Sequence, residues 1–304
     1  MKKSSILIIL ILSGVITSAV AQRVKPTYRQ FLFNPYLYNP AFVGINDQVE
    51  LNLVYRKQWV SIDGAPVTTG INLQVPTSDR VMLGLNVVTD KQVLLRNTSM
   101  MGTFGYVVPI DHKQTLRFAL SGGLGMNDLD LTEEELSTND PAILNAANNN
   151  YYIDGNFGVV YTNGGFRLGF ALTELFKSDP FNYEGFNEFS ISNLKNRIYS
   201  MSYRFNLDRF ERVSMEPYVV YKRSSDEYQN AWEAATVIYF KDVLWTGASY
   251  HQHGGLGLLL GFNVADKFRF SYNYEFPPFK SDFPAMSTHE LQLNMRFGKK
   301  EPRR

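Results

Sequence analysis

Near the C-terminus of this chain, apolar and polar residues alternate with a period of two. In segments 268–276 and 290–297, every second residue is apolar or aromatic, and the residues between them are polar or charged. The apolar positions are Phe268, Phe270, Tyr272, Tyr274 and Phe276, followed after a loop by Leu291, Leu293, Met295 and Phe297. Because successive side chains of a β-strand point to opposite faces, each segment predicts a strand with one apolar face. That face would meet a second sheet in a soluble sandwich, and lipid in an outer-membrane barrel.

The same alternation recurs along the chain from Val49 onward. Further stripes lie at 51–55, 67–75, 81–87, 100–108, 116–124, 153–161, 166–172, 199–205, 213–221, 232–240, 244–250 and 256–264. Together with the C-terminal pair they predict about fourteen strands. This is an even number, as closed single-chain barrels of bacterial outer membranes have.

The lengths of the connections separate the two architectures. Counting from the first hairpin, every second connection is short: 76–80, 109–114, 163–165, 207–212, 241–242 and 265–267. Most of the others are longer, at 57–66, 130–150, 176–195 and 277–288. A membrane barrel has short periplasmic turns and long external loops, whereas no alternation of short and long loops is expected in a soluble sandwich. We therefore predict an all-β fold, a transmembrane antiparallel outer-membrane β-barrel over residues 49–297, with both ends on the periplasmic side.

The first residues have the pattern of a cleavable signal peptide. Lys2 and Lys3 precede an apolar run at 6–12, and Ala19-Val20-Ala21 has the small residues of a cleavage site. The apolar run is shorter than a membrane-spanning helix needs, and no later stretch is long enough either. We expect a signal peptide over 1–21, cleavage after Ala21 and localisation in the outer membrane. The basic tail, 298–304, would then lie in the periplasm.

Residues 22–48 form a segment that is not strand-like. Asn34-Pro35 and Asn39-Pro40 are turn-forming pairs, and proline cannot donate to a sheet ladder. Aromatic residues surround both pairs, at Phe31, Phe33, Tyr36, Tyr38 and Phe42. Since disordered tails are poor in aromatic residues, a frayed terminus is the weaker interpretation. We expect an ordered periplasmic or plug-like segment that packs in the lumen.

Composition narrows the possible chemistry. The absence of cysteine excludes disulfides, thiolate metal sites and cysteine nucleophiles. A net charge of +1 gives no electrostatic reason to expect nucleic-acid binding. The slightly negative mean hydropathy is compatible with a membrane barrel, because half of each strand faces a wet interior.

Outer-membrane barrels can be enzymes, so histidines and serines need to be considered. His251 and His253 share one side of an extended chain and could form a metal pair, but no third ligand accompanies them. Ser249 shares the inward face with His251, yet no third catalytic group follows and the GxSxG motif is absent. We predict no catalytic residues, no metal and no cofactor.

Arg56 and Trp59 stand out at the end of the first predicted strand. Arg56 shares the face of Asn52 and should point into the lumen, where a charged side chain needs partners. Trp59 falls where an aromatic girdle or a loop anchor would lie. A structural role for both is at least as well supported as a role in binding.

Several of these residues resemble the signatures of a known family. Tyr38-Asn39-Pro40-Ala41, closed by Gly44, resembles the N-terminal signature of the PorP/SprF family, outer-membrane proteins of the type IX secretion system of Bacteroidetes. Tyr55-Arg56-Lys57-Gln58-Trp59, followed by Gly64, Pro66 and Thr68, resembles a second signature, and His289-Glu290-Leu291 with Phe297 is similar to the closing strand. Phe42 and Val43 depart mildly from the first motif. The residues predicted to carry the signature or its structure are Asn34, Pro35, Tyr38, Asn39, Pro40, Ala41, Gly44, Tyr55, Arg56, Gln58, Trp59, Gly64 and Pro66.

The resemblance implies a role in protein secretion. Such a barrel would bind exported cargo through its C-terminal sorting domain, often of gliding-adhesin type, for export and surface attachment. Its partners would be outer-membrane lipid, type IX translocon subunits, the cargo and a periplasmic peptidoglycan-associated protein. The alternative from another class is an outer-membrane channel for small or hydrophobic solutes, which would need a continuous lumen.

Overall fold

The structure is a computed structural model that describes residues 33–93, 95–129, 150–176, 196–224, 230–252, 255–277 and 287–298. The predicted signal peptide, its cleavage after Ala21 and residues 299–304 of the tail lie outside these residues. His253 of the candidate metal pair also lies outside them. Among the described residues, no helix has the length and apolar character to cross a membrane.

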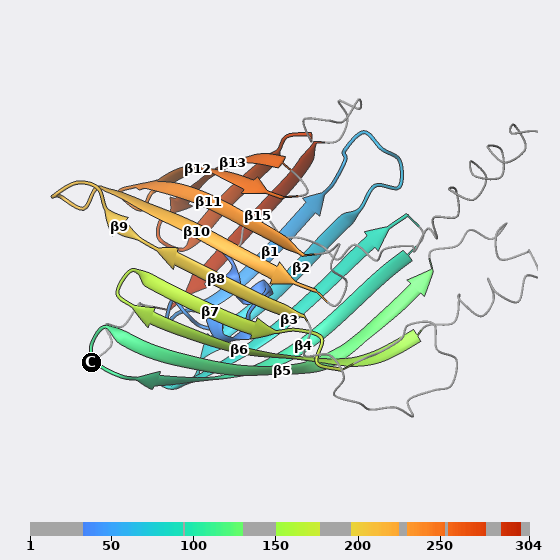
Figure 1. Cartoon of the computed structure of the whole chain (residues 1–304), viewed down its shortest axis with the longest axis horizontal. Coiled ribbons are helices and arrows are strands. Elements are labelled where there is room, and N and C mark those ends of the chain that lie inside the picture. The colour runs from blue at the N-terminus through green and yellow to red at the C-terminus, as the bar shows by residue number, and fades with distance from the viewer. Residues whose placement is uncertain are drawn as a thin grey trace, which may run out of the picture.

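One antiparallel sheet closes on itself as a barrel (Figure 1). Its strands are β1 (Val49–Lys57), β2 (Val67–Pro76), β3 (Val81–Gln92), β4 (Leu95–Pro109), β5 (Gln114–Leu129), β6 (Asn150–Asn163), β7 (Phe166–Leu172), β8 (Arg197–Tyr203), β9 (Phe205–Asn206), β10 (Val213–Arg223), β11 (Ala231–Phe240), β12 (Leu244–His251), β13 (Gly255–Val264), β14 (Phe268–Glu275) and β15 (Thr288–Phe297). Pairing of β15 with β1, and of β10 with β11, closes the ring. Because β9 continues β8 after a single residue and both pair with β10, the barrel has fourteen strands, which confirms the predicted fold.

The two faces of each strand follow the predicted alternation. In β1, Asn52, Val54 and Arg56 are buried in the lumen, whereas Leu53 and Tyr55 are exposed on the outer face. Large apolar side chains are exposed on the outer face of every long strand, and no second sheet covers them in the described part of the chain. An apolar exterior around a polar interior is the arrangement of a membrane barrel and not of a soluble sandwich.

Some strands are longer than their apolar stripes. β4 and β5 span 15 and 16 residues, and their extra residues at the loop end are partly polar. Asn97 of β4 and Asn127 of β5 are hydrogen-bonded there, at 2.5 Å between Nδ2 and Oδ1. The β3–β4 connection is also short, since β3 ends at Gln92 and β4 begins at Leu95. Alternating apolar residues therefore mark the lipid-facing part of a strand but not its full length.

Residues 33–48 of the predicted N-terminal segment lie inside the barrel, as the blue ribbon in Figure 1 shows, whereas residues 22–32, with Phe31, lie outside the described part of the chain. Two 3-10 helices, η1 (Pro35–Leu37) and η2 (Pro40–Phe42), precede β1. We call residues 33–48 the plug. Its contacts with the barrel fall mainly in the half that carries the short turns.

Candidate functional site: the plug in the barrel lumen

Each Asn-Pro pair opens one of the two 3-10 helices. Proline occupies the first helical position in both, where its missing N–H leaves no hydrogen bond unmade. The Asn39 Oδ1 accepts a hydrogen bond of 2.9 Å from the backbone N–H of Ala41 and so caps η2. Asn34 precedes η1 without a side-chain cap, and its buried amide has no hydrogen-bond partner among the described residues. The predicted turns are therefore present, and Asn39 holds the second one.

Apolar contacts attach the plug to two sides of the lumen. Phe42 and Val43 belong to a buried cluster with wall residues Val54, Met82, Val107, Ala119, Val160, Tyr218 and Val220. Phe33 belongs to a second cluster, with Val237, Tyr239, Trp245 and Leu259 of β11, β12 and β13. Since β5 and β12 lie on roughly opposite sides of the ring, the plug crosses the lumen.

Tyrosine hydroxyls of the plug bond to the inner wall. The Tyr36 hydroxyl lies 2.6 Å from Oγ1 of Thr103, which is itself 2.6 Å from Oγ of Ser121. The Tyr38 hydroxyl accepts a hydrogen bond from the hydroxyl of Tyr218 on β10. Burial raises the pKa of Tyr36 to about 12 and raises that of Tyr38 further. Both hydroxyls therefore remain protonated at physiological pH and can act as hydrogen-bond donors and acceptors.

Backbone groups of the first signature are also held by the wall. Arg117 of β5 is 2 % exposed and donates from Nε to the Ala41 carbonyl at 3.2 Å and from Nη2 to the Val43 carbonyl at 2.6 Å. From the plug, Asn39 Nδ2 donates to the carbonyls of Val159 and Phe170, at 3.4 and 3.2 Å. A guanidinium that bonds two carbonyls fixes the direction of the chain between them.

Gly44 ends the signature for a steric reason. Its φ of +61° is a conformation that residues with a Cβ rarely adopt. A Cβ there would also lie 2.7 Å from Sδ of Met82. The Gly44 N–H donates to Oε1 of Gln74 at 2.9 Å, which ties this turn to β2.

Glycines of the inner wall make room for the plug. A Cβ on Gly84 would lie 2.5 Å from the Tyr36 hydroxyl, and one on Gly105 would lie 2.5 Å from Cγ1 of Val43. A Cβ on Gly158 would collide with Oδ1 of Asn39. Neither these glycines nor Arg117 were predicted from the sequence as plug contacts. The glycines could have been identified by their position on the inward face of a strand, because a glycine there often marks the close approach of another backbone.

The second signature lies elsewhere, at the loop end of β1. Arg56 points into the lumen as predicted, with Nη2 at 3.5 Å from Glu275 and Nε at 3.5 Å from Glu290. Tyr55 is exposed on the outer face. Beyond the strand, the backbone N–H of Gln58 donates to the Pro66 carbonyl at 2.9 Å, Gly64 has a φ of +72°, and Trp59 is partly exposed. The structure does not bring the two signatures together.

His251 and Ser249 are inward-facing, as predicted. His251 Nε2 is 3.1 Å from Oε1 of Glu233, which is 3.6 Å from Nζ of Lys222. Glu233 of β11 thus lies between Lys222 of β10 and His251 of β12. Within the described ranges, no three His, Cys, Asp or Glu side chains are placed to hold a metal ion.

Comparison with known proteins gives the family and the fold. A family described as type IX secretion system membrane protein PorP/SprF matches residues 20–295. A search of curated proteins finds no match. The barrel is similar to the Pseudomonas putida toluene transporter TodX, with 11% identity over 86% of this chain and 93% of that one and a TM-score of 0.50. It is also similar to the CymD monoaromatic hydrocarbon channel, with 10% identity over 87% and 93% of the two chains and a TM-score of 0.51. At these identities the similarity shows an outer-membrane barrel fold alone.

Proposed function

Because the chain belongs to the PorP/SprF family of type IX secretion system membrane proteins, we propose that it is an outer-membrane docking component of that system. At the cell surface it binds the C-terminal sorting domain of exported cargo proteins, a domain of gliding-adhesin type. On the other side it contacts translocon subunits and a peptidoglycan-associated protein through the short turns. The family is described by its place in a secretion system and not by an enzymatic activity.

The observation that carries this proposal is the plug. It contacts wall clusters on two sides of the lumen, and Arg117, Thr103 and Tyr218 bond it to the wall. A barrel whose interior is crossed by its own chain is suited to act as a rigid support, with recognition carried by loops and turns. An open pore for solutes would need the same space.

The second candidate is a channel for small or hydrophobic solutes. The barrels similar to this chain are named as a toluene transporter and a monoaromatic hydrocarbon channel. In that case the plug would have to leave a continuous path or move aside.

Affinity purification from native outer membrane separates the two candidates. The protein, tagged at its C-terminus, is extracted in mild detergent, and the proteins that accompany it are identified by mass spectrometry. An unrelated barrel from the same membrane, tagged in the same way, is the matched control. We expect translocon subunits and the C-terminal region of a large secreted protein with this barrel and not with the control.

Recovery of the barrel alone would contradict docking. If the same preparation also gave steady single-channel conductance after reconstitution, the channel would be the better assignment. Recovery of translocon subunits without any secreted protein would support the assignment of this barrel to the secretion system, but it would contradict cargo binding.

A further inference from the structure

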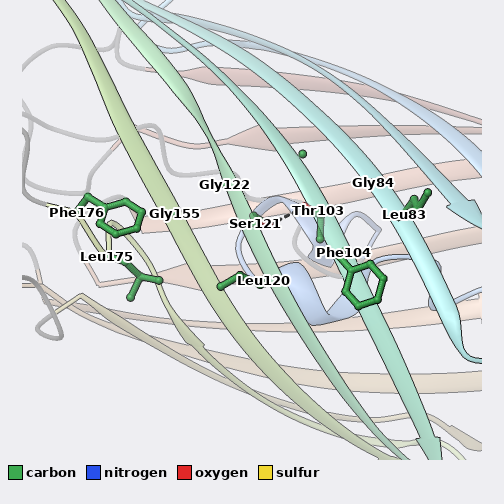
Figure 2. A pocket seen from close by; sticks show the side chains of 11 residues that line it. Leu83, Gly84, Thr103, Phe104, Leu120, Ser121, Gly122, Gly155, Leu175 and Phe176 are labelled. Carbon is green, nitrogen blue, oxygen red and sulfur yellow. Dashed lines mark hydrogen bonds between the residues drawn. The ribbon is translucent and has the colours of Figure 1, made fainter. Parts of the chain in front are cut away.

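The lipid-facing surface of the barrel has a depression over β3 to β6 (Figure 2). Its volume is about 580 Å³. Gly102, Gly122 and Gly155 are direct cross-strand partners on three neighbouring strands; Gly102 and Gly122 form the open floor, and Phe176 lies over Gly155. Leu83, Phe104 and Leu120, which are also in register, form one wall, and Leu175 and Phe176 close one end.

The two floor glycines, Gly102 and Gly122, are not explained by contacts within the protein, whereas a Cβ on Gly155 would lie 2.8 Å from Cε2 of Phe176. A Cβ on Gly122 would meet nothing within 4 Å, and one on Gly102 would meet only the Gly122 carbonyl, at 4.0 Å. The neighbouring Gly123 is different, because a Cβ there would collide with the main chain of Met100 and Met101. Nor is there a bulge at the floor, since the ladders run without interruption through Gly102 and Gly122. Apart from bulges and bends, glycine inside a strand marks the close approach of a ligand or a backbone.

The side chains that project on both sides of the floor limit the size of a molecule that can contact it. Phe104 is 54% exposed and Leu120 is 59% exposed, so both project well beyond the glycines. On the far side of the floor, the next outward residues on the same strands are Met100 and Leu124, which are half-exposed. Residues four apart on a strand are about 13 Å apart between Cα atoms, and the side chains on both sides narrow this gap further. A second barrel would rest on these projecting side chains without touching the floor, whereas a single extended chain fits between them.

The chemistry of the depression is apolar. Its lining residues with hydroxyl groups are Thr103 and Ser121, which bond each other on the lumen side, where Thr103 also bonds the Tyr36 hydroxyl. The backbone N–H and C=O groups of the floor are engaged in the ladders. The depression is also continuous with the belt of exposed apolar side chains that faces lipid.

We propose that this depression binds one acyl chain of an outer-membrane lipid, which lies across β4 and β5 against Gly102 and Gly122 and ends at Phe176. From Gly102 to Gly122 the chain crosses one strand spacing, or about 5 Å, before it meets Phe176 over Gly155. The bound chain lies on the outer side of the same stretch of wall whose inner side holds Tyr36 of the plug.

Cross-linking with a photoreactive lipid tests the site. The protein is reconstituted in phosphatidylcholine vesicles that contain phosphatidylcholine with a diazirine in one acyl chain, and cross-linked peptides are mapped by mass spectrometry. In the wild type, labelling of Phe104, Leu120 and Phe176 is expected to exceed labelling of outward residues on β12 and β13 several-fold. Gly122→Leu places a side chain in the depression at a position where its Cβ would meet nothing within 4 Å, and it is expected to reduce this labelling to that of the other strands. Ala248→Leu is the matched control, because Ala248 is exposed on the outer face of β12, and should leave it unchanged.

Two results would overturn the proposal. One is uniform labelling of all outward strands, and the other is labelling at β4 to β6 that Gly122→Leu does not change. If Gly122→Leu instead removed a protein that co-purifies with the barrel, the depression would be a protein interface and not a lipid site. Folding of each variant is checked by its heat-dependent mobility in gels, and Gly102→Leu provides a second variant with the same expected loss.

Discussion

Asn39 has two functions at the centre of the plug. Its side-chain oxygen caps η2 and its Nδ2 donates to carbonyls of β6 and β7. The cap needs an acceptor and the wall contact needs a donor, and an asparagine amide has both. Its neighbours in the signature also bond to the wall: the Tyr38 hydroxyl accepts a hydrogen bond from Tyr218, and the Ala41 carbonyl accepts one from Arg117. The signature thus consists of residues that bind the plug to the wall.

Replacement of Asn39 by alanine should loosen the plug. The loss of the cap and of the wall contacts is expected to cost about 1–2 kcal/mol of local stability. Hydrogen exchange at the Ala41 amide, which donates to Asn39, should then be faster. Asn39→Ser keeps a capping oxygen and should exchange at an intermediate rate. Equal exchange in all three proteins would show that Asn39 does not hold η2.

Gly158 should tolerate no side chain, because a Cβ there would collide with Asn39 Oδ1. We expect Gly158→Ala to displace the plug from β6, at a cost of about 1–3 kcal/mol, as for other overpacked sites. Gly122→Ala is the matched control, since a Cβ at Gly122 meets nothing within 4 Å. Protease cleavage within residues 33–48 of the folded barrel should increase for Gly158→Ala only. Similar cleavage of both variants would contradict the close contact.

At the scale of elements, a period of two was enough to predict the strands. Each apolar stripe corresponds to a strand, and the stripe ends where the lipid belt ends. The loop ends of β4 and β5 were not predictable, because beyond the belt the outward positions hold polar residues, such as Arg96, Thr98 and Asp128, and the apolar alternation stops. The plug was predictable as an ordered segment from its aromatic residues and Asn-Pro pairs. Its partners, Arg117 and the inward-facing glycines, were not, since they lie far along the chain and only the closed barrel brings them together.

The lipid-facing row of β5 should be sensitive to charge. Leu120 is 59% exposed on the outer face, and Leu120→Arg places a guanidinium in hydrocarbon. We expect a loss of about 2–4 kcal/mol in the free energy of folding into lipid vesicles, measured by urea titration. Ile110 in the β4–β5 turn is 56% exposed at the end of the barrel, and Ile110→Arg should change this free energy by less than about 0.5 kcal/mol. Equal losses for the two variants would contradict the assignment of the membrane belt.

At the scale of the whole molecule, the barrel and the plug form one structure. β1 follows directly on the plug and pairs with β15 at the closing seam. Asn46 of the plug bonds Glu50 on β1, and Arg296 on β15 bonds the same carboxylate. The segment that crosses the lumen is therefore tied to the seam that closes the ring. This connection favours a plug that stays in place while loops and turns bind partners.

Single-channel conductance in planar bilayers tests the central claim, that residues 33–48 close the lumen. The full-length protein is compared with a variant that lacks residues 33–46, each shown to be folded by its heat-dependent mobility. We predict no steady conductance steps for the full-length protein and clear steps for the deletion variant, with Gly158→Ala giving intermittent opening. Equal behaviour of the full-length and deletion proteins, whether both conduct or neither does, would contradict a lumen closed by the plug.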